Sequence, residues 1–235
     1  MEITLPHEQL LKALELTNRI SSKNPTLPVL QCVRIKADKE SVTLEATNLE
    51  INIIIPLKGL VAEEGVVAVP AQTFLQSVQL IQQREITLRT EENVLQLETD
   101  KSNTSIKTFI ADEFPTIKKL EGTELPLSAA TFAYGIKSVA FAASQTSIKP
   151  ELGSVYVQQK KEHSLTFVAT DSFRLMEKTT SQKSIVLDTP FMIPNKNALE
   201  LARVSEVLGG EPKMIVTENQ CALLFEDGVY VSSRL

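Results

Sequence analysis

The stretch Ala46-Thr47-Asn48 returns 123 residues later in the chain as Ala169-Thr170-Asp171. Three further landmarks recur in the same order at nearly the same spacing. The matched pairs are Thr4-Leu5-Pro6 with Glu124-Leu125-Pro126, Pro25-Thr26-Leu27 with Pro150-Glu151-Leu152, and Val69-Pro70 with Ile193-Pro194. Ordered recurrence at a nearly constant spacing indicates an internal duplication. Because the spacing is too long for a solenoid repeat, each copy is expected to be a whole domain.

Each copy has the hydrophobic pattern of two amphipathic helices and about eight short strands. The first helix is predicted over residues 6–19, with Leu10, Leu11 and Leu14 on its apolar face and Glu8, Lys12, Glu15 and Arg19 on its polar face. Further helices are predicted over 71–81, 128–144 and 195–207. Alternating patterns predict strands over 29–35, 42–46 and 51–57, one that ends at Val69, and others near Ile86, Val94, Ser105, Ser154, Leu165, Arg174 and Ile185.

This order of elements predicts an α+β fold in which one domain occurs twice. Domain one is expected over residues 1–120 and domain two over 124–235, each with two helices on one side of antiparallel sheet. Hydrophobic residues make up 43% of the chain and charged residues 23%, which is typical of a globular protein with a core.

The composition favours a cytoplasmic protein. No apolar run approaches the ~20 residues that cross a bilayer, so no membrane contact is expected. The N-terminus lacks the basic and apolar regions of a signal peptide. Cys32 and Cys221 each lie in an apolar, strand-like stretch, which favours buried free thiols over a disulfide.

The net charge of −5 argues against a protein that grips nucleic acid through a strongly basic surface. The charges are unevenly distributed, however. The predicted helices carry a net charge of +1, from Lys12, Arg19, Lys137, Lys196 and Arg203 against Glu8, Glu15, Glu200 and Glu206. Residues 71–83 carry no charge at all. Helices that face phosphates should lack carboxylates, because like charges repel; scatter among nine charges is the alternative explanation.

Taken in order, the motifs resemble those of the bacterial DNA polymerase sliding clamps, the polymerase III beta subunits. The first copy contains Pro25-Thr26-Leu27-Pro28-Val29-Leu30, Ala46-Thr47-Asn48-Leu49-Glu50, Val69-Pro70-Ala71 and Phe114-Pro115. The second contains Pro150-Glu151-Leu152, Ala169-Thr170-Asp171-Ser172-Phe173-Arg174-Leu175 and Ile193-Pro194-Asn195-Lys196. Each motif alone is weak, but the ordered set is specific and covers the whole chain.

The resemblance implies a processivity factor for DNA replication that is not an enzyme and needs no cofactor. Family members have three such domains, and two subunits close head to tail into a ring with the helices around the hole. Double-stranded DNA threads the ring without sequence preference. DNA polymerase III, clamp loader subunits and other proteins with a clamp-binding motif dock short peptides in a cleft between domains two and three.

Carried over position by position, the resemblance implies two sets of site residues. The cleft residues are Leu152, Thr170, Ser172, Phe173, Arg174 and Leu175, of which Phe173 stands at a variable position. The DNA-facing residues are Lys12, Lys23, Asn24, Lys137, Lys149, Lys196 and Arg203. Asn24 departs from the basic residue that the family often has there, and Lys23 is expected to substitute for it. An alternative for Lys196 is a surface ion pair with Glu200, four residues further along the helix.

Other functions have weaker support in the sequence. His163, Asp171 and Ser172 form an imaginable hydrolase triad, but the chain has no Gly-x-Ser-x-Gly turn. It also has neither a His/Cys cluster with metal-ligand spacing nor a phosphate-binding glycine loop. A two-domain adaptor that binds proteins but not DNA would explain the acidic pI equally well.

The position of the second copy's end predicts that a third clamp domain is absent. The counterpart of Phe114-Pro115 would fall near positions 238 and 239, beyond Leu235. We therefore expect domain two to be truncated at its C-terminal edge. A two-domain clamp that closes as a trimer is the alternative.

Overall fold

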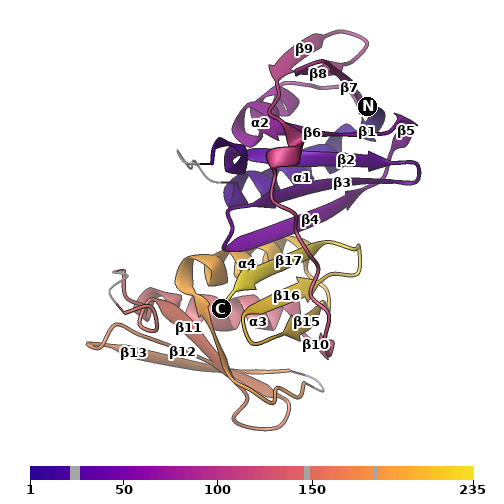
Figure 1. Ribbon diagram of the computed structural model, residues 1–235. Helices are drawn as coiled ribbons and strands as arrows, with labels where there is room; N and C mark the ends of the chain where they lie inside the picture. Colours follow the sequence, from indigo (N-terminus) through magenta and orange to yellow (C-terminus); the bar gives the residue numbers. More distant parts are fainter. Residues whose placement is uncertain (22–26, 146–148, 183–184) are drawn as a thin grey trace. The chain divides into compact units, whose positions relative to one another are not determined.

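The computed structural model describes residues 1–21, 27–145, 149–182 and 185–235. The chain divides into two compact units, Met1–Lys118 (unit 1) and Lys119–Leu235 (unit 2). Figure 1 colours unit 1 from indigo to magenta and unit 2 from pink to yellow. Each unit is described by itself.

Unit 1 has two antiparallel sheets and two helices, α1 (His7–Ile20) and α2 (Ala71–Gln79). One sheet has the order β5-β1-β7-β8-β9, from β1 (Glu2–Pro6), β5 (Leu60–Glu63), β7 (Glu85–Glu91), β8 (Val94–Glu98) and β9 (Asn103–Lys107). The other runs β4-β3-β2-β6, from β2 (Cys32–Asp38), β3 (Ser41–Thr47), β4 (Ile51–Leu57) and β6 (Gly65–Pro70). Short 3-10 turns lie at Pro28–Gln31 and Ala111–Glu113.

Unit 2 repeats this topology with helices α3 (Ala129–Val139) and α4 (Asn195–Leu208). One sheet runs β10-β15-β16-β17, from β10 (Leu125–Pro126), β15 (Lys213–Val216), β16 (Gln220–Leu224) and β17 (Tyr230–Arg234). The other runs β13-β12-β11-β14, from β11 (Ser154–Gln158), β12 (Ser164–Thr170), β13 (Leu175–Ser181) and β14 (Phe191–Pro194). Apart from β5, every strand of unit 1 has a counterpart among the described residues of unit 2. The predicted tandem α+β repeat is therefore confirmed, with the strands of each copy divided between two sheets.

The helices form as the hydrophobic pattern predicts. Leu10 and Leu14 of α1 are fully buried, while Leu11 is half-buried at the edge of the apolar face. The four charged residues of the predicted polar face are all exposed. Within each unit the two helices pack against each other and against the strands, which buries their apolar faces in one core.

One pair of matched prolines, unlike the other, does not occupy equivalent positions in the two units. Pro70 and Pro194 both end a strand directly before a helix, as predicted. Pro6 also directly precedes its helix, but in unit 2 that position is Ser128, and Pro126 lies two residues earlier. Alignment of Pro6 with Pro126 was therefore wrong by two residues. A shift of two residues keeps the missing N–H on the same side of the strand, because the next residue, His7 or Leu127, donates its N–H across the ladder to Arg84 or Pro212.

Three predicted elements differ from the structure. The strand expected from Val29 begins at Cys32, because Pro28 opens a 3-10 turn. The helix expected to reach Ser144 ends at Val139 and continues as the 3-10 turn Ala140–Ala142.

The third difference concerns the strand expected near Ile185. The side-chain amide of Gln159 donates to the carbonyl of Ile185 at 2.9 Å and accepts from the N–H of Leu187 at 2.6 Å. One side chain thus satisfies backbone groups that a neighbouring strand would otherwise pair. The strand of this region is β14, which begins at Phe191.

Candidate peptide-binding site

The turn between β12 and β13 is organised by the side chain of Asp171. Its Oδ1 accepts hydrogen bonds from the N–H groups of Phe173 at 3.0 Å and Arg174 at 2.9 Å. Its Oδ2 accepts from Nε of Arg174 at 3.0 Å. The backbone hydrogen bonds from Arg174 and Phe173 hold the pKa of Asp171 below its ordinary value.

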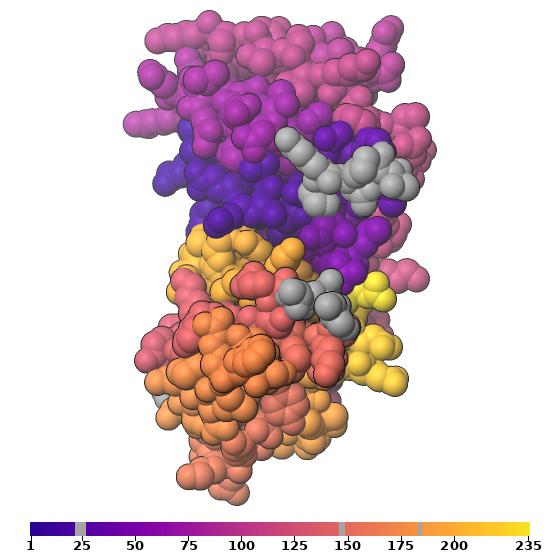
Figure 2. Space-filling model, turned by 90° about the vertical axis from the view of Figure 1, so that its left-hand side faces the viewer, coloured from indigo at the N-terminus to yellow at the C-terminus, as the bar shows by residue number. Residues whose placement is uncertain are grey.

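Thr170 and Ser172 shape the same turn rather than line a pocket. The hydroxyl of Thr170 donates to the carbonyl of Arg174 at 2.7 Å and accepts from the N–H of Ser172 at 3.1 Å. Ser172 has a left-handed backbone, with φ of 77°. This conformation reverses the chain and leaves Phe173 98% exposed. Figure 2 shows the side of unit 2 on which the orange residues of this hairpin face the viewer.

A pocket of about 380 Å³ opens beside the turn. Its lining residues come from three segments: Ala143, Ser144 and Gln145; Lys149 and Leu152; and Asp171, Phe173 and Arg174. The structure therefore brings together three of the six predicted cleft residues. Leu175, the first residue of β13, is 63% exposed next to the pocket lining, where it pairs with Thr170.

Arg174 is held at this pocket from two sides. Its guanidinium lies over the ring of Phe141, 5.7 Å from the ring centre, within the range of a cation–π contact. Asp171 provides the second contact by accepting a hydrogen bond from Nε. Sequence reasoning misses Phe141, because the hydrophobic pattern predicts a continuous helix over residues 128–144 that includes it. Its exposure of 55% arises because the 3-10 turn after α3 presents its ring to the surface.

The predicted DNA-facing residues that the structure describes divide into three groups. Lys12 on α1 and Lys196 on α4 are exposed and form no ion pair with a described residue. Lys137 and Arg203 are paired with carboxylates, Glu206 at 2.5 Å and Glu200 at 2.7 Å. Lys149 is exposed and lines the pocket beside Arg174. Lys23 and Asn24 lie outside the described residues.

The possible ion pair between Lys196 and Glu200 is not formed. Glu200 pairs with Arg203 instead, because Arg203 Nε reaches its carboxylate from three residues further along α4.

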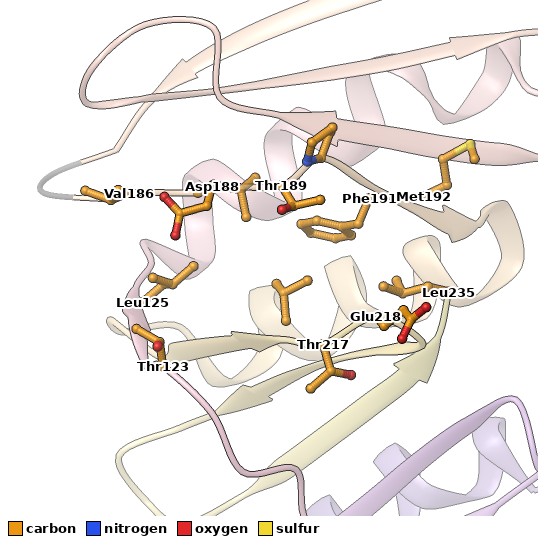
Figure 3. Close-up of a pocket in the computed structure, with 13 residues that line it drawn as sticks. Thr123, Leu125, Val186, Asp188, Thr189, Phe191, Met192, Thr217, Glu218 and Leu235 are labelled. Atoms are coloured by element: carbon orange, nitrogen blue, oxygen red, sulfur yellow. The ribbon is translucent and has the colours of Figure 1, made fainter.

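A second groove in unit 2, of about 810 Å³, lies between its two sheets (Figure 3). In unit 1 the strand β5 pairs with β1 at the corresponding place. In unit 2, Pro126 stands where β1 has Thr4, and its missing N–H weakens pairing at this edge. The segment from Val186 to Pro190 therefore stays apart from β10, and the groove remains open between Leu125 and Phe191.

The structure does not assemble the imaginable triad. His163 and Asp171 lie at opposite ends of β12, about 25 Å apart for an extended strand. His7, at the start of α1, lies 3.0 Å from the carbonyl of Val78 and so links the two helices of unit 1. Within the described ranges, no three His, Cys, Asp or Glu residues are placed to hold a metal ion.

Both cysteines are free and buried, as predicted. Burial raises the pKa of each thiol to about 12. Among the described helices, none has the length and apolar character needed to cross a membrane.

Comparison with known proteins places these features in one family. Residues 1–118 match the family model of the DNA polymerase III beta subunit, N-terminal domain, and residues 126–235 match that of its central domain. The chain is 26% identical to the beta sliding clamp of Pseudomonas aeruginosa over 93% of its length, and 31% identical to that of Streptococcus pneumoniae over 83%. These alignments cover 60% and 54% of the two relatives.

Solved structures agree with the sequence comparison. The DNA polymerase III subunit beta of Pseudomonas aeruginosa superposes on the whole chain with a TM-score of 0.91 at 25% identity. A putative beta subunit from Eubacterium rectale shares the fold, with a TM-score of 0.93 at 21% identity. The chain spans 64% and 65% of these two proteins.

Proposed function

The chain belongs to the DNA polymerase III beta subunit family, and from this membership we propose that it acts as a DNA sliding clamp. In this role it tethers replication proteins to double-stranded DNA in the cytoplasm and catalyses no reaction itself. Ring formation by association of copies belongs to the same proposal. Proteins named beta sliding clamps among its relatives support it.

The observation that carries the proposal is the pocket at the β12–β13 turn. Leu152 and Phe173 supply apolar walls, and Arg174 and Lys149 supply positive charge. Such a lining suits a short peptide with hydrophobic anchors and an acidic or polar group. The pocket would then be the docking point for DNA polymerase III, clamp loader subunits and other proteins with a clamp-binding motif.

The helices support a loose, sequence-independent contact with DNA. Lys12 and Lys196 are exposed cations that could meet phosphates, and such contacts position a protein without reading bases. Lys137 and Arg203 are partly neutralised by carboxylates on α4. Few unpaired cations mean that few counterions are released on binding, so the affinity stays low. A weak contact of this kind suits a protein that slides.

Peptide binding tests the first part of the proposal. A fluorescent peptide with two hydrophobic anchors and one acidic residue is titrated with the wild type, with Leu152→Ala and with Leu60→Ala. Leu60 is a matched control, because it is 76% exposed on β5 of unit 1. Loss of affinity in Leu152→Ala alone supports the pocket. Equal affinities in all three proteins would refute it.

Cross-linking to DNA separates a clamp from an adaptor that binds only proteins. A photoreactive group is attached at Lys196→Cys on α4 and, as the control, at Lys107→Cys at the end of β9. A clamp should cross-link to a DNA duplex mainly from position 196, in a Cys32→Ala, Cys221→Ala background. An adaptor should give equal background yields from both positions.

A further inference from the structure

The turn that carries Asp171 has a counterpart in unit 1 with the same hydrogen bonds. Asn48 Oδ1 accepts from the N–H groups of Glu50 at 3.0 Å and Ile51 at 2.9 Å, the distances found around Asp171. Leu49 takes the left-handed backbone with φ of 74°, as Ser172 does in unit 2. A neutral amide oxygen is therefore sufficient to build this turn.

The negative charge of Asp171 must then be explained by something other than the turn. In unit 1 the residue that follows the turn is Ile51, which has no polar side chain, and the turn residue is Asn48. In unit 2 the corresponding residue is Arg174, and the turn residue is an acid whose second oxygen accepts from Nε. The carboxylate and the guanidinium thus occur together in unit 2, where Asp171 and Arg174 both line the pocket beside the turn.

The pair contributes little to stability by itself. Asp171 and Arg174 lie three positions apart in the chain at the surface, and the Arg174 side chain is 54% exposed. Exposed ion pairs of this kind stabilise a fold weakly. A hydrogen bond at Nε does, however, fix the plane of the guanidinium and leave its two terminal amino groups to donate elsewhere.

We propose that Asp171 is a positioning residue for peptide binding. Its carboxylate and the Phe141 ring hold the Arg174 side chain over the pocket, so that the terminal N–H groups are oriented toward an acidic group of a bound peptide. This inference rests on the proposed function of the pocket. Fixing a long side chain before binding lowers the entropy lost when the peptide arrives.

The negative charge of Asp171 also acts directly on a peptide, and this effect is opposite to the gain from positioning Arg174. The test must separate the two effects. A carboxylate near the pocket repels an acidic peptide, so its removal alone would strengthen binding. That repulsion acts through solvent and is screened at high salt, where the Debye length falls to about 3 Å at 1 M. Loss of orientation is not screened. Measurements at high salt therefore isolate positioning.

The test uses Asp171→Asn, which keeps the oxygen that caps the turn, as Asn48 does in unit 1. Thermal unfolding should be unchanged. Affinity for an acidic two-anchor peptide at about 1 M salt should fall about three- to tenfold. The same peptide with its acid replaced by the amide should show a smaller loss. Asn48→Asp, which adds a carboxylate to the same turn in unit 1, is the matched control and should bind as the wild type does.

A second measurement does not depend on a peptide. NMR relaxation of the Arg174 Nε–H group should show a rigid side chain in the wild type and a mobile one in Asp171→Asn. Equal mobility, or equal affinity at high salt, would overturn the positioning role, while Leu152→Ala would still report on the pocket. If no peptide binds the wild type, the proposed function fails and the inference fails with it.

Discussion

The ammonium group of Lys137, on α3, lies 2.5 Å from a carboxylate oxygen of Glu206, on α4. The two side chains are about half exposed, so the pair links neighbouring helices at the surface of unit 2. Lys137 was expected from sequence to face DNA, and the structure shows that it carries its own counterion. A lysine paired in this way releases fewer ions from DNA than a free one does.

Substitution of Glu206 should therefore strengthen DNA binding. In Glu206→Gln, Lys137 is freed to contact a phosphate, and the slope of log affinity against log salt should steepen by up to about 0.9. Fluorescence anisotropy with a DNA duplex at several salt concentrations measures this slope.

Glu177→Gln is the matched control, because Glu177 of β13 pairs with Lys160 at the same distance of 2.5 Å but lies off the helices. It removes the same charge and frees a lysine of the same kind. Equal slopes for the two variants would show that the helix surface has no special role in DNA contact.

Truncation of either the charged residue or the apolar residue beside the pocket should by itself weaken peptide binding. Arg174→Ala and Leu175→Ala are each expected to cost about 1–2 kcal/mol of binding free energy if they act as anchors. Titration calorimetry with a two-anchor peptide measures both losses. Wild-type affinity in both variants would remove these two residues from the site.

The turn at Asp171 could be predicted from sequence because its chemistry is local. Asn and Asp side chains can accept from backbone N–H groups two and three residues ahead, and both the Ala-Thr-Asn and the Ala-Thr-Asp of this chain form the same turn. The amphipathic pattern of α1 was equally informative, since one buried face repeats every three or four residues.

Features that depend on tertiary contacts could not be predicted in this way. The stacking of Arg174 on Phe141 joins residues more than thirty positions apart. The amide of Gln159 replaces a strand partner for Ile185, and nothing in either local sequence indicates that contact. The two-residue shift between Pro6 and Pro126 also became visible only from the strand register and the helix starts.

The buried thiol of Cys221 should make stability depend on alkaline pH. Burial raises its pKa from 9.0 to about 12 in the folded protein. Below pH 9 the thiol keeps its proton in both the folded and the unfolded state. Its contribution to the stability of the folded protein is then fully present. Between pH 9 and 12 the unfolded state loses the proton first, so the unfolding free energy should fall by about 1.4 kcal/mol per pH unit for this thiol.

Thermal or denaturant unfolding at several alkaline pH values measures this dependence. Other groups also titrate in this range, so the comparison is with Cys221→Ala, whose unfolding free energy should fall less steeply. If the two proteins have the same dependence on pH, the thiol of Cys221 does not titrate differently in the folded and unfolded states.

Replacement of Gly135 on α3 should destabilise unit 2, against the usual trend for helices. Alanine normally favours a helix over glycine by about 1 kcal/mol. At Gly135, however, an added Cβ would lie 2.2 Å from the ring of Phe167, which is fully buried on β12 and also packs edge-on against Phe132. Because this ring is fully buried, relieving the contact would displace its neighbours, so Gly135→Ala is expected to cost about 1–3 kcal/mol by overpacking. Denaturant unfolding measures the loss.

Combining Gly135→Ala with Phe167→Leu should recover part of the lost stability, because the smaller side chain leaves space for the new methyl group. A stabilised Gly135→Ala protein would show that helix propensity, rather than the contact with Phe167, decides the effect at this position.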